Sequence, residues 1–284
     1  MRSLYELDKE IAVLMGADPN NISNSYTASK ELLTAIGGNP SKDLDTNAVY
    51  KAISEGAING AFSQGLTVPD SVCFGCSDFT EFPSDIKVSK DRTDFSYLFY
   101  INQYLVTGPK LNTSNATTME YMFYYCSKLE TVPVYDTKNV VKFSYMFYNC
   151  TNLTSVNINI TNKATNVGSM FGSCGKLKTI NGVQDLTNIT NFNSMFNGCM
   201  MLQEIRLTGE LNATINFGDF YSGYTQLSYD SVKSILTAGT NKTSTSKTYI
   251  TFRKLTMTDQ NGELAALVAG CNAKDITING LTLQ

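Results

Sequence analysis

The stretch "FSYMFYNCTNLTSVNI", residues 143–158, joins a Met-Phe pair, a cysteine and a short β-branched run within sixteen residues. The same layout returns in "MEYMFYYCSKLETVPV" (119–134), "VGSMFGSCGKLKTING" (167–182) and "FNSMFNGCMMLQEIRL" (192–207). We take the phenylalanine of each Met-Phe pair as the anchor of its copy. The anchors are 24, 24 and 25 residues apart, which indicates an internal repeat: Phe123, Phe147, Phe171 and Phe196.

Weaker copies flank these four. "FSYLFYINQYL" has its anchor at Phe99 and "FGDFYSGYTQL" has its anchor at Phe220, each 24 residues from the nearest strong anchor. Further upstream, "SVCFGCSDFTEFP" (71–83) overlays the strong copies through its Cys-Ser and its final proline. One such unit cannot bury its apolar face alone, so the repeat predicts a stack of about seven coils.

The apolar residues of each strong copy fall at fixed offsets from the anchor. They lie four residues before it, at the anchor itself, and then three, six, nine and usually eleven residues after it. The last three positions read L-x-x-V-x-I, and their alternation with period two is typical of a strand. The Met-Phe part, with spacings of three and four, favours one or two turns of helix. Each coil is therefore predicted to hold a short helix, a tight turn and a strand of a parallel sheet.

The pattern Met-Phe-x-x-Cys-x-x-Leu-x-x-Val/Ile resembles the BspA-like leucine-rich repeats of bacterial surface proteins and some phage proteins. The resemblance covers residues 70 to about 227, just over half of the chain. It implies an α/β solenoid, a leucine-rich-repeat-like stack of about seven 24-residue coils over residues 61–227. It says less about function, because such repeats present binding surfaces to many unrelated ligands.

Residues 1–60 precede the repeats and contain three short segments with helix start and stop signals. Helices this short are not stable alone in water, so they need a partner surface. We expect this segment to be an anchor or oligomerisation module, and the alternative is a small helical cap over the first coil. The first helix places four apolar candidate anchor residues at heptad-like spacing: Leu4, Leu7, Ile11 and Leu14.

Residues 228–284 follow the repeats and change the pattern. "LSYDSVKSILTAG" predicts a helix capped by Ser228 and ending at Gly239, and "KTYITFRKL" predicts a strand. A second helix in "TDQNGELAALVAGC" and a last strand in "DITING" complete the chain. We expect this α/β unit to seal the end of the solenoid, as terminal repeats commonly do.

The composition excludes several classes of function. With 22 Lys and Arg and a formal net charge of −3, the chain has no electrostatic footprint for nucleic acid or anionic lipid. It contains no histidine, which removes histidine acid–base catalysis and the commonest metal ligand. No run of eighteen apolar residues exists, so we expect no membrane insertion. We therefore predict that the chain is not an enzyme and binds no cofactor.

Four of the seven cysteines occupy the same offset in successive coils. A buried free cysteine behaves as a small apolar residue, and a disulfide between neighbouring coils would need a narrow geometry. We therefore expect a column of core thiols at Cys126, Cys150, Cys174 and Cys199. The C-x-x-C at residues 73–76 lacks a second pair at zinc-ligand spacing, which argues against a metal site.

The alternation of the predicted strands points a set of small polar residues outward. Hydroxyl and amide groups of this kind can hydrogen-bond a sugar or another protein. The alternative is an ordinary solvated sheet face. This candidate ligand face consists of Thr131, Ser155, Asn157, Thr179, Asn181, Glu204 and Arg206.

Tyrosines recur two residues before and one residue after the anchor in three successive coils. The next two coils have Ser169 and Ser194 at the first offset, and Gly172 and Asn197 at the second. Stacking predicts two adjacent rows of rings that form a contact surface between chains or with a ligand; alternatively, the rings only cover the coils. The six candidate residues are Tyr97, Tyr100, Tyr121, Tyr124, Tyr145 and Tyr148.

The sequence begins with three acidic residues among its first ten and shows no long apolar region of a signal peptide. Together with the repeat resemblance, this favours a bacteriophage virion protein of head-fibre or tail-fibre type, assembled in the host cytoplasm. Its expected partners are capsid or tail proteins, further copies of the chain, and a host glycan or surface protein. The alternatives are a bacterial surface adhesin and an intracellular interaction scaffold.

Overall fold

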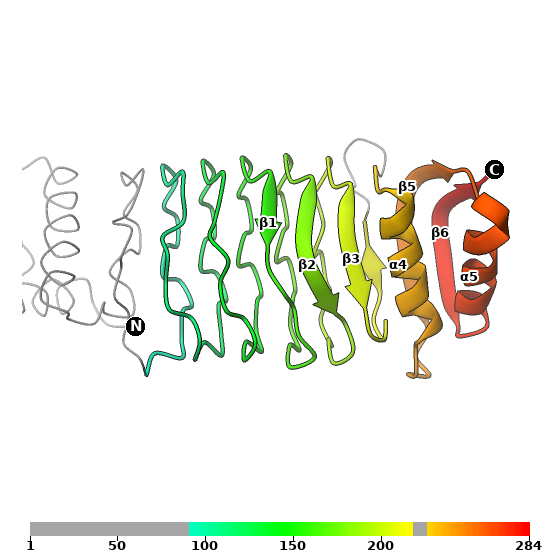
Figure 1. The fold of residues 1–284 in the computed structure, drawn as a ribbon, viewed down its shortest axis with the longest axis horizontal. Coiled ribbons are helices and arrows are strands. Elements are labelled where there is room, and N and C mark those ends of the chain that lie inside the picture. Colours follow the sequence, from blue (N-terminus) through cyan, green and yellow to red (C-terminus); the bar gives the residue numbers. More distant parts are fainter. Residues whose placement is uncertain (1–90, 218–225) are drawn as a thin grey trace, which may run out of the picture.

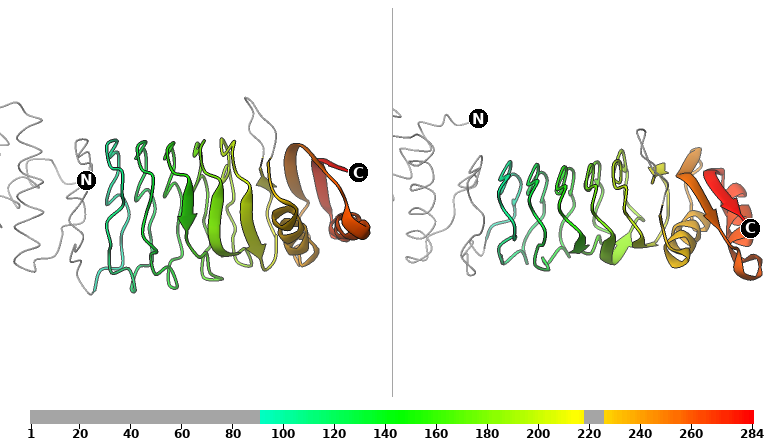
Figure 2. Two further views of the ribbon diagram at one scale, coloured as in Figure 1. Left: turned by 45° about the horizontal axis from the view of Figure 1, so that its top comes forward. Right: turned by 90° about the horizontal axis from the view of Figure 1, so that it is seen from above.

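The computed structural model describes residues 91–217 and 226–284. The predicted helices of residues 1–60 with their anchor leucines, the copy at residues 71–83 and the anchor Phe220 lie outside the described residues. From residue 91 onward the chain winds into coils that stand side by side in a row, ending in a unit with two helices (Figure 1). The two further views show the same row from other sides (Figure 2).

Parallel pairing joins successive coils. Isolated bridges link Thr118 to Lys142 and Lys142 to Asn166, residues that are 24 apart in the sequence. The longer strands β1 (Ser155–Asn157), β2 (Thr179–Asp185) and β3 (Glu204–Thr208) form a parallel sheet in that order. The parallel strands predicted from the L-x-x-V-x-I pattern are thereby confirmed for these three coils.

The Met-Phe segments are turns, and the predicted short helices there are wrong. Each segment has a left-handed residue two positions before its anchor and another two positions after it, with φ of 60° at Tyr97 and 59° at Ile101. Such residues interrupt helical pairing. The N–H of Tyr100 still bonds within the coil, to the carbonyl of Tyr97, but the N–H of Phe99 bonds to Met122 in the next coil. The spacing of apolar residues does not reveal that successive N–H groups bond alternately within the coil and to the next coil.

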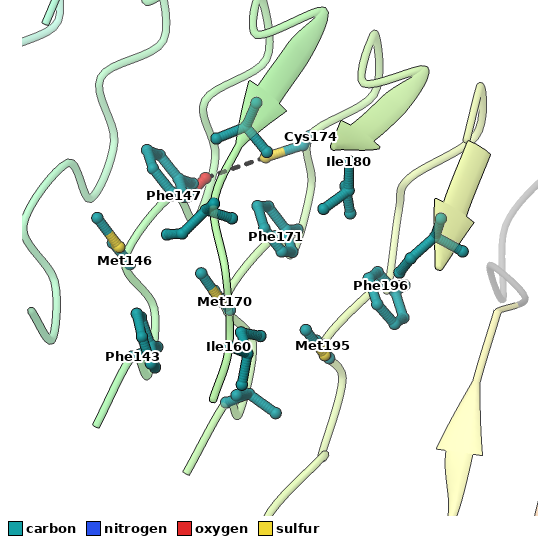
Figure 3. Close-up of a cluster of buried hydrophobic side chains, with 14 of the residues drawn as sticks. Phe143, Met146, Phe147, Ile160, Met170, Phe171, Cys174, Ile180, Met195 and Phe196 are labelled. Carbon is teal, nitrogen blue, oxygen red and sulfur yellow. Dashed lines mark hydrogen bonds between the residues drawn. The ribbon is translucent and has the colours of Figure 1, made fainter. Parts of the chain in front are cut away.

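The anchor phenylalanines form one continuous stack through the core (Figure 3). Neighbouring rings have centroids 5.0 to 6.1 Å apart and planes within 15° of parallel. The stack runs past the repeats into the C-terminal unit, so both share one core. Its members are Phe99, Phe123, Phe147, Phe171, Phe196, Phe217 and Phe252.

The cysteine column lies beside this stack, and the five described cysteines are free thiols. Each thiol of the column donates a hydrogen bond to the carbonyl of an anchor phenylalanine in an earlier coil, as Cys174 does to Phe147 at 3.0 Å (Figure 3). Cys126, Cys150 and Cys174 are fully buried, as predicted, whereas Cys199 is half-buried. Burial raises the pKa of the Cys174 thiol to about 12.

One predicted core position is wrong. Val134, eleven residues after its anchor, is 63% exposed. Pro133 precedes it, and no strand forms in this coil. Tyr135 occupies the core instead, and its hydroxyl donates to the carbonyl of Pro109 at 2.9 Å.

The four predicted elements of the C-terminal unit are confirmed, with shifted ends. They are helix α4 (Tyr229–Thr240), strand β5 (Thr248–Met257), helix α5 (Glu263–Asn272) and strand β6 (Ile276–Leu283). A 3-10 turn, η2 (Gln260–Gly262), leads into α5. Strand β4 (Ile215–Asn216) joins β5 and β6 in a second parallel sheet of order β4-β5-β6.

Helix α4 ends the first sheet by lying beside β3, where the next strand would otherwise stand. The hydroxyl of Ser231 accepts the N–H of Ile205 at 3.0 Å, and the hydroxyl of Ser234 accepts the N–H of Leu207 at 3.2 Å. Two serines thus satisfy backbone donors on the open edge of β3. In the described part of the chain, no helix has the length and apolar character to cross a membrane.

Candidate contact surface

The six tyrosines form the two adjacent rows predicted from the repeat period, and we call them the tyrosine surface. In the first row, Tyr97, Tyr121 and Tyr145, both neighbouring centroid distances are 4.8 Å and the planes differ by 5° and 8°. In the second row the distances are 5.0 and 5.3 Å, and the planes differ by 4° and 14°. Its members are Tyr100, Tyr124 and Tyr148.

The two rows touch each other through tilted rings. Tyr121 and Tyr124 have centroids 5.4 Å apart at 58°, and Tyr145 and Tyr148 lie 5.5 Å apart at 60°. Tyr125 adjoins them at 4.6 Å from Tyr124 and is 37% exposed. The sequence reasoning missed Tyr125, although the Tyr-Tyr pair at 124–125 is visible in the copy at residues 119–134.

The second row ends where the repeat changes from tyrosine to glycine. A Cβ added at Gly172 would lie 2.7 Å from Cδ2 of Tyr148, so the ring of Tyr148 lies directly against this glycine. In the first row the next residue is Ser169, which is buried. The tyrosine surface is thus confined to three coils by the residues that follow it.

The backbone of the first row does not account for tyrosine there. Tyr97, Tyr121 and Tyr145 have φ between 57° and 60°, and Ser169 and Ser194 have φ of 53° and 56° at the same offset. The left-handed conformation therefore belongs to the coil and not to the side chain. Because it costs a non-glycine residue about 1 kcal/mol or more, a bulky ring at three of these positions indicates a role for the side chain.

Three phenol groups of this surface, those of Tyr97, Tyr121 and Tyr124, have a raised pKa and remain protonated donors. Partial burial raises the pKa of Tyr97, and Glu120, Tyr100 and Asp94 raise it further. Partial burial and the neighbouring phenols likewise raise the pKa of Tyr121. Among the described residues, the hydroxyls of Tyr121 and Tyr145 make no hydrogen bond. They can therefore bond to a partner.

Six of the seven residues of the candidate ligand face lie on the first sheet, and Thr131 lies in an earlier coil. The members of this face are exposed, apart from the half-buried Thr179. The register aligns Ser155 with Thr179, and Asn157 with Asn181. Thr131 forms an isolated bridge with Thr107 of the preceding coil.

The structure changes the interpretation of two members of this face. Glu204 accepts a hydrogen bond from the hydroxyl of Ser228 at 2.8 Å, so its carboxylate belongs to the junction with α4. The register between β2 and β3 shifts after Ile180, so Arg206 is not aligned with Asn181. Glu204 therefore continues the row of Ser155 and Thr179 but is engaged by Ser228, and Arg206 does not continue the row of Asn157 and Asn181.

The tyrosine surface and the candidate ligand face present hydroxyl groups, amide groups and aromatic rings. Among the described residues, no three His, Cys, Asp or Glu side chains gather as metal ligands would. Cys126, Cys150 and Cys174 of the column are buried, and burial raises the pKa of Cys150 well above the ordinary value, so this thiol stays protonated. A protonated thiol is a poor nucleophile. The hydroxyls and ring edges of the tyrosine surface remain accessible for contacts.

Comparison with known proteins gives one match. Residues 93–208 are similar to a family described as "Mycoplasma protein of unknown function, DUF285". The match covers less than half of the chain and includes the whole tyrosine surface and candidate ligand face. No curated protein and no solved structure matches the chain.

Proposed function

We propose that the chain is a non-enzymatic binding protein whose coils form a leucine-rich-repeat-like solenoid carrying the tyrosine surface. The observation that carries this proposal is the pair of stacked tyrosine rows, the first of which stands at left-handed backbone positions that disfavour bulky residues. Tyrosine offers a large amphipathic area at low cost in side-chain entropy, and it is enriched in protein interfaces. Stacking holds the rings in place before a partner arrives, which reduces the entropy lost on binding.

The orientation of the rings favours a protein as the partner. Within a row each ring covers the face of its neighbour, so a partner meets ring edges and hydroxyls. A sugar packs best on an open aromatic face, which the rows do not offer between their ends. A protein can place carbonyl oxygens on the hydroxyls and apolar side chains on the ring edges.

A double variant, Tyr124→Ser with Tyr148→Ser, tests this surface. We expect binding of the labelled full chain to intact host cells or to purified phage particles to fall about tenfold or more, because two of the three rings of the second row are lost. The matched control is Ser155→Ala with Asn157→Ala on the candidate ligand face, which should bind like the wild type. Loss of binding in the control alone would show that the partner contacts the candidate ligand face and not the tyrosine surface.

We further propose that the protein belongs to a bacteriophage particle, with residues 1–60 docking on capsid or tail proteins and the coils displayed outward. The resemblance of the repeats to BspA-like repeats of bacterial surface and phage proteins supports this placement. Mass spectrometry of purified particles tests it, since a virion component should be present in a fixed ratio to the capsid protein. Absence from the particles would overturn the proposal.

A bacterial surface adhesin is the second candidate. The similarity to a family of Mycoplasma proteins favours it, because that family is bacterial. The two candidates place the protein differently, on particles or on cells. Antibody labelling of intact producing cells, compared with purified particles, distinguishes them.

A further inference from the structure

The dipeptide Asn-Gly occurs five times in the chain. It is chemically labile, because the backbone nitrogen of the glycine can attack the side-chain amide carbon of the asparagine. The attack closes a five-membered succinimide ring only if the peptide plane between the two residues can rotate, so a fold that fixes this plane protects the asparagine. Four copies, at Asn181, Asn197, Asn261 and Asn279, lie in the described part of the chain, and the copy at Asn59 lies outside it.

Two of the described copies belong to the repeats, and bonds between coils fix their peptide planes. The carbonyl of Asn197 accepts the N–H of Ser173 at 2.6 Å, and the carbonyl of Asn181 accepts the N–H of Ile158 at 3.1 Å. The second plane is also packed, because a Cβ added at Gly182 would lie 2.5 Å from the carbonyl oxygen of Ile158. Neither plane can rotate unless the bond to the neighbouring coil breaks.

The copy at Asn279 lies within strand β6. Asn279 is aligned with Thr251 in the parallel pair of β5 and β6. Gly280 lies so close to the main chain of β5 that an added Cβ would collide with the carbonyl oxygen of Phe252. The sheet therefore holds this peptide plane, although the side chain of Asn279 is exposed.

The copy at Asn261 differs from these three, because it lies in the turn η2 between β5 and α5. Asn261 and Gly262 are both exposed, and a Cβ added at Gly262 would meet no described atom within 4 Å outside its chain neighbours. In the described part of the chain, neither the side chain nor the carbonyl of Asn261 bonds to another strand or coil. Rotation of this peptide plane therefore breaks no contact with the rest of the fold.

We propose that Asn261 is a site of spontaneous deamidation by water, and that the fold protects the other three described copies. The nitrogen of Gly262 loses its proton and bonds to Cγ of Asn261, and the side-chain nitrogen leaves as ammonia. Water then adds to one of the two ring carbonyls and breaks its bond to the ring nitrogen. The product is aspartate or isoaspartate, so one water is consumed, one ammonia is released and no electron is transferred.

The conversion changes the segment that leads into α5. Either product adds one negative charge, which takes the formal net charge from −3 to −4. Isoaspartate also adds one carbon atom to the main chain. Both changes fall between Asp259 and the N–H groups of Leu264 and Ala265, which the Asp259 carboxylate accepts at 2.9 and 3.0 Å. The site thus gives the C-terminal unit a slow chemical change beside the bonds that hold α5.

Peptide mapping of the full chain by mass spectrometry tests this selectivity, and it reports each asparagine separately. The folded wild type is incubated at mildly alkaline pH, where the attacking nitrogen loses its proton more readily. We expect Asn261 to be converted at least about fivefold faster than the other three described copies, because only those three require local opening of the fold. In the urea-unfolded chain all four should be converted at similar rates.

Asn261→Gln shows whether the mass gain comes from this residue, because a glutamine would have to close a six-membered ring, which forms much more slowly. The matched control is Asn197→Gln, which should leave the conversion of Asn261 unchanged. The proposal is overturned if Asn181, Asn197 or Asn279 is converted as fast as Asn261 in the folded chain. It is equally overturned if folding slows the conversion of Asn261 as much as that of the other three.

Discussion

At the scale of single residues, the thiol column explains why one offset keeps cysteine in successive coils. The site is apolar, yet it lies within reach of an anchor carbonyl, and Cys150 donates to that of Phe123 at 3.1 Å. A thiol is both a small apolar group and a weak donor. Alanine would lose the donor and leave a cavity, whereas a larger apolar residue would collide with the neighbouring coil.

The buried thiols make stability depend on pH in the alkaline range. Burial raises the pKa of Cys174 from 9.0 to about 12, so the folded state keeps this proton while the unfolded state loses it. Stability from this group is complete below pH 9 and is lost as the pH rises toward 12. Urea unfolding at pH 8 and pH 10.5 should show a loss that is about 2 kcal/mol smaller in Cys174→Ala than in the wild type.

The control for this experiment is Ser155→Ala, which removes an exposed hydroxyl and should keep the wild-type pH dependence. Tyrosines and lysines also titrate in this range, but they contribute equally to all three proteins. Identical losses in Cys174→Ala and the wild type would contradict a buried, protonated thiol.

Gly172 is the residue that allows the second tyrosine row to end flat against the next coil. In Gly172→Ala the new Cβ would meet the ring of Tyr148 at 2.7 Å, and we expect a cost of about 1–3 kcal/mol from overpacking. The near-UV circular dichroism of the tyrosines should change as well. Gly175→Ala is the control, because its Cβ meets the end of Met200 at 3.4 Å and the carbonyl oxygen of Gly198 at 4.0 Å, which are ordinary contacts. Equal effects of both substitutions would mean that the Tyr148 ring moves aside at no cost and that Gly172 is not required at this position.

At the scale of elements, the sequence predicts the strands and core columns better than the turns. The offsets of Phe147, Leu153 and Val156 follow from burial, and burial leaves a periodic trace in the sequence. The left-handed residues leave none, since tyrosine, serine and isoleucine all occupy them. The spacing of apolar residues by three and four in the Met-Phe segments therefore predicted a helix, whereas alternate N–H groups there bond to carbonyls of the next coil.

The candidate surfaces were predictable to the same extent. A constant period places equal offsets side by side, so the tyrosine rows followed from the sequence. The hydrogen bond from Ser228 to Glu204 could not be predicted from the sequence, because it depends on where α4 lies after the repeats. Position in a repeat thus predicts contacts between equivalent coils, but not contacts with a unit that breaks the repeat.

The serines of α4 give a test of how the first sheet ends. Ser231 is buried, and its hydroxyl accepts the N–H of Ile205 and also donates to the carbonyl of Gln203 at 3.1 Å. Ser231→Ala leaves the buried N–H without a partner, so we expect a cost of about 1–3 kcal/mol in urea unfolding. Hydrogen exchange of the Ile205 amide should accelerate.

Ser246→Ala is the matched control, because Ser246 is exposed and lies outside α4. It should leave both readouts unchanged. A wild-type rate of hydrogen exchange for the Ile205 amide in Ser231→Ala would show that Ser231 does not protect the edge of β3.

At the scale of the whole molecule, the phenylalanine stack joins the coils and the C-terminal unit into one core. Each ring contacts the ring before it and the ring after it, so stability passes along the row from neighbour to neighbour. Such an array unfolds as one unit only while every interface along it is strong. Breaking one interface in the middle should therefore divide it.

Phe171→Ala provides this break, because Phe171 stacks on Phe147 at 5.7 Å and on Phe196 at 6.1 Å. We expect a loss of about 3–5 kcal/mol and, in addition, two separate unfolding transitions. Tyrosine circular dichroism reports on the coils before residue 171. A tryptophan introduced by Tyr249→Trp reports on the C-terminal unit, since the chain contains no other tryptophan.

In the wild type the two probes should give the same midpoint in urea, and in Phe171→Ala the midpoints should separate. Val183→Ala, which trims a side chain that is 37% exposed on β2, serves as the control and should keep the midpoints together. Coincident midpoints in Phe171→Ala would show that backbone bonds between coils, such as that from the N–H of Phe147 to the carbonyl of Met170 at 2.9 Å, are sufficient to couple the row without the ring stack.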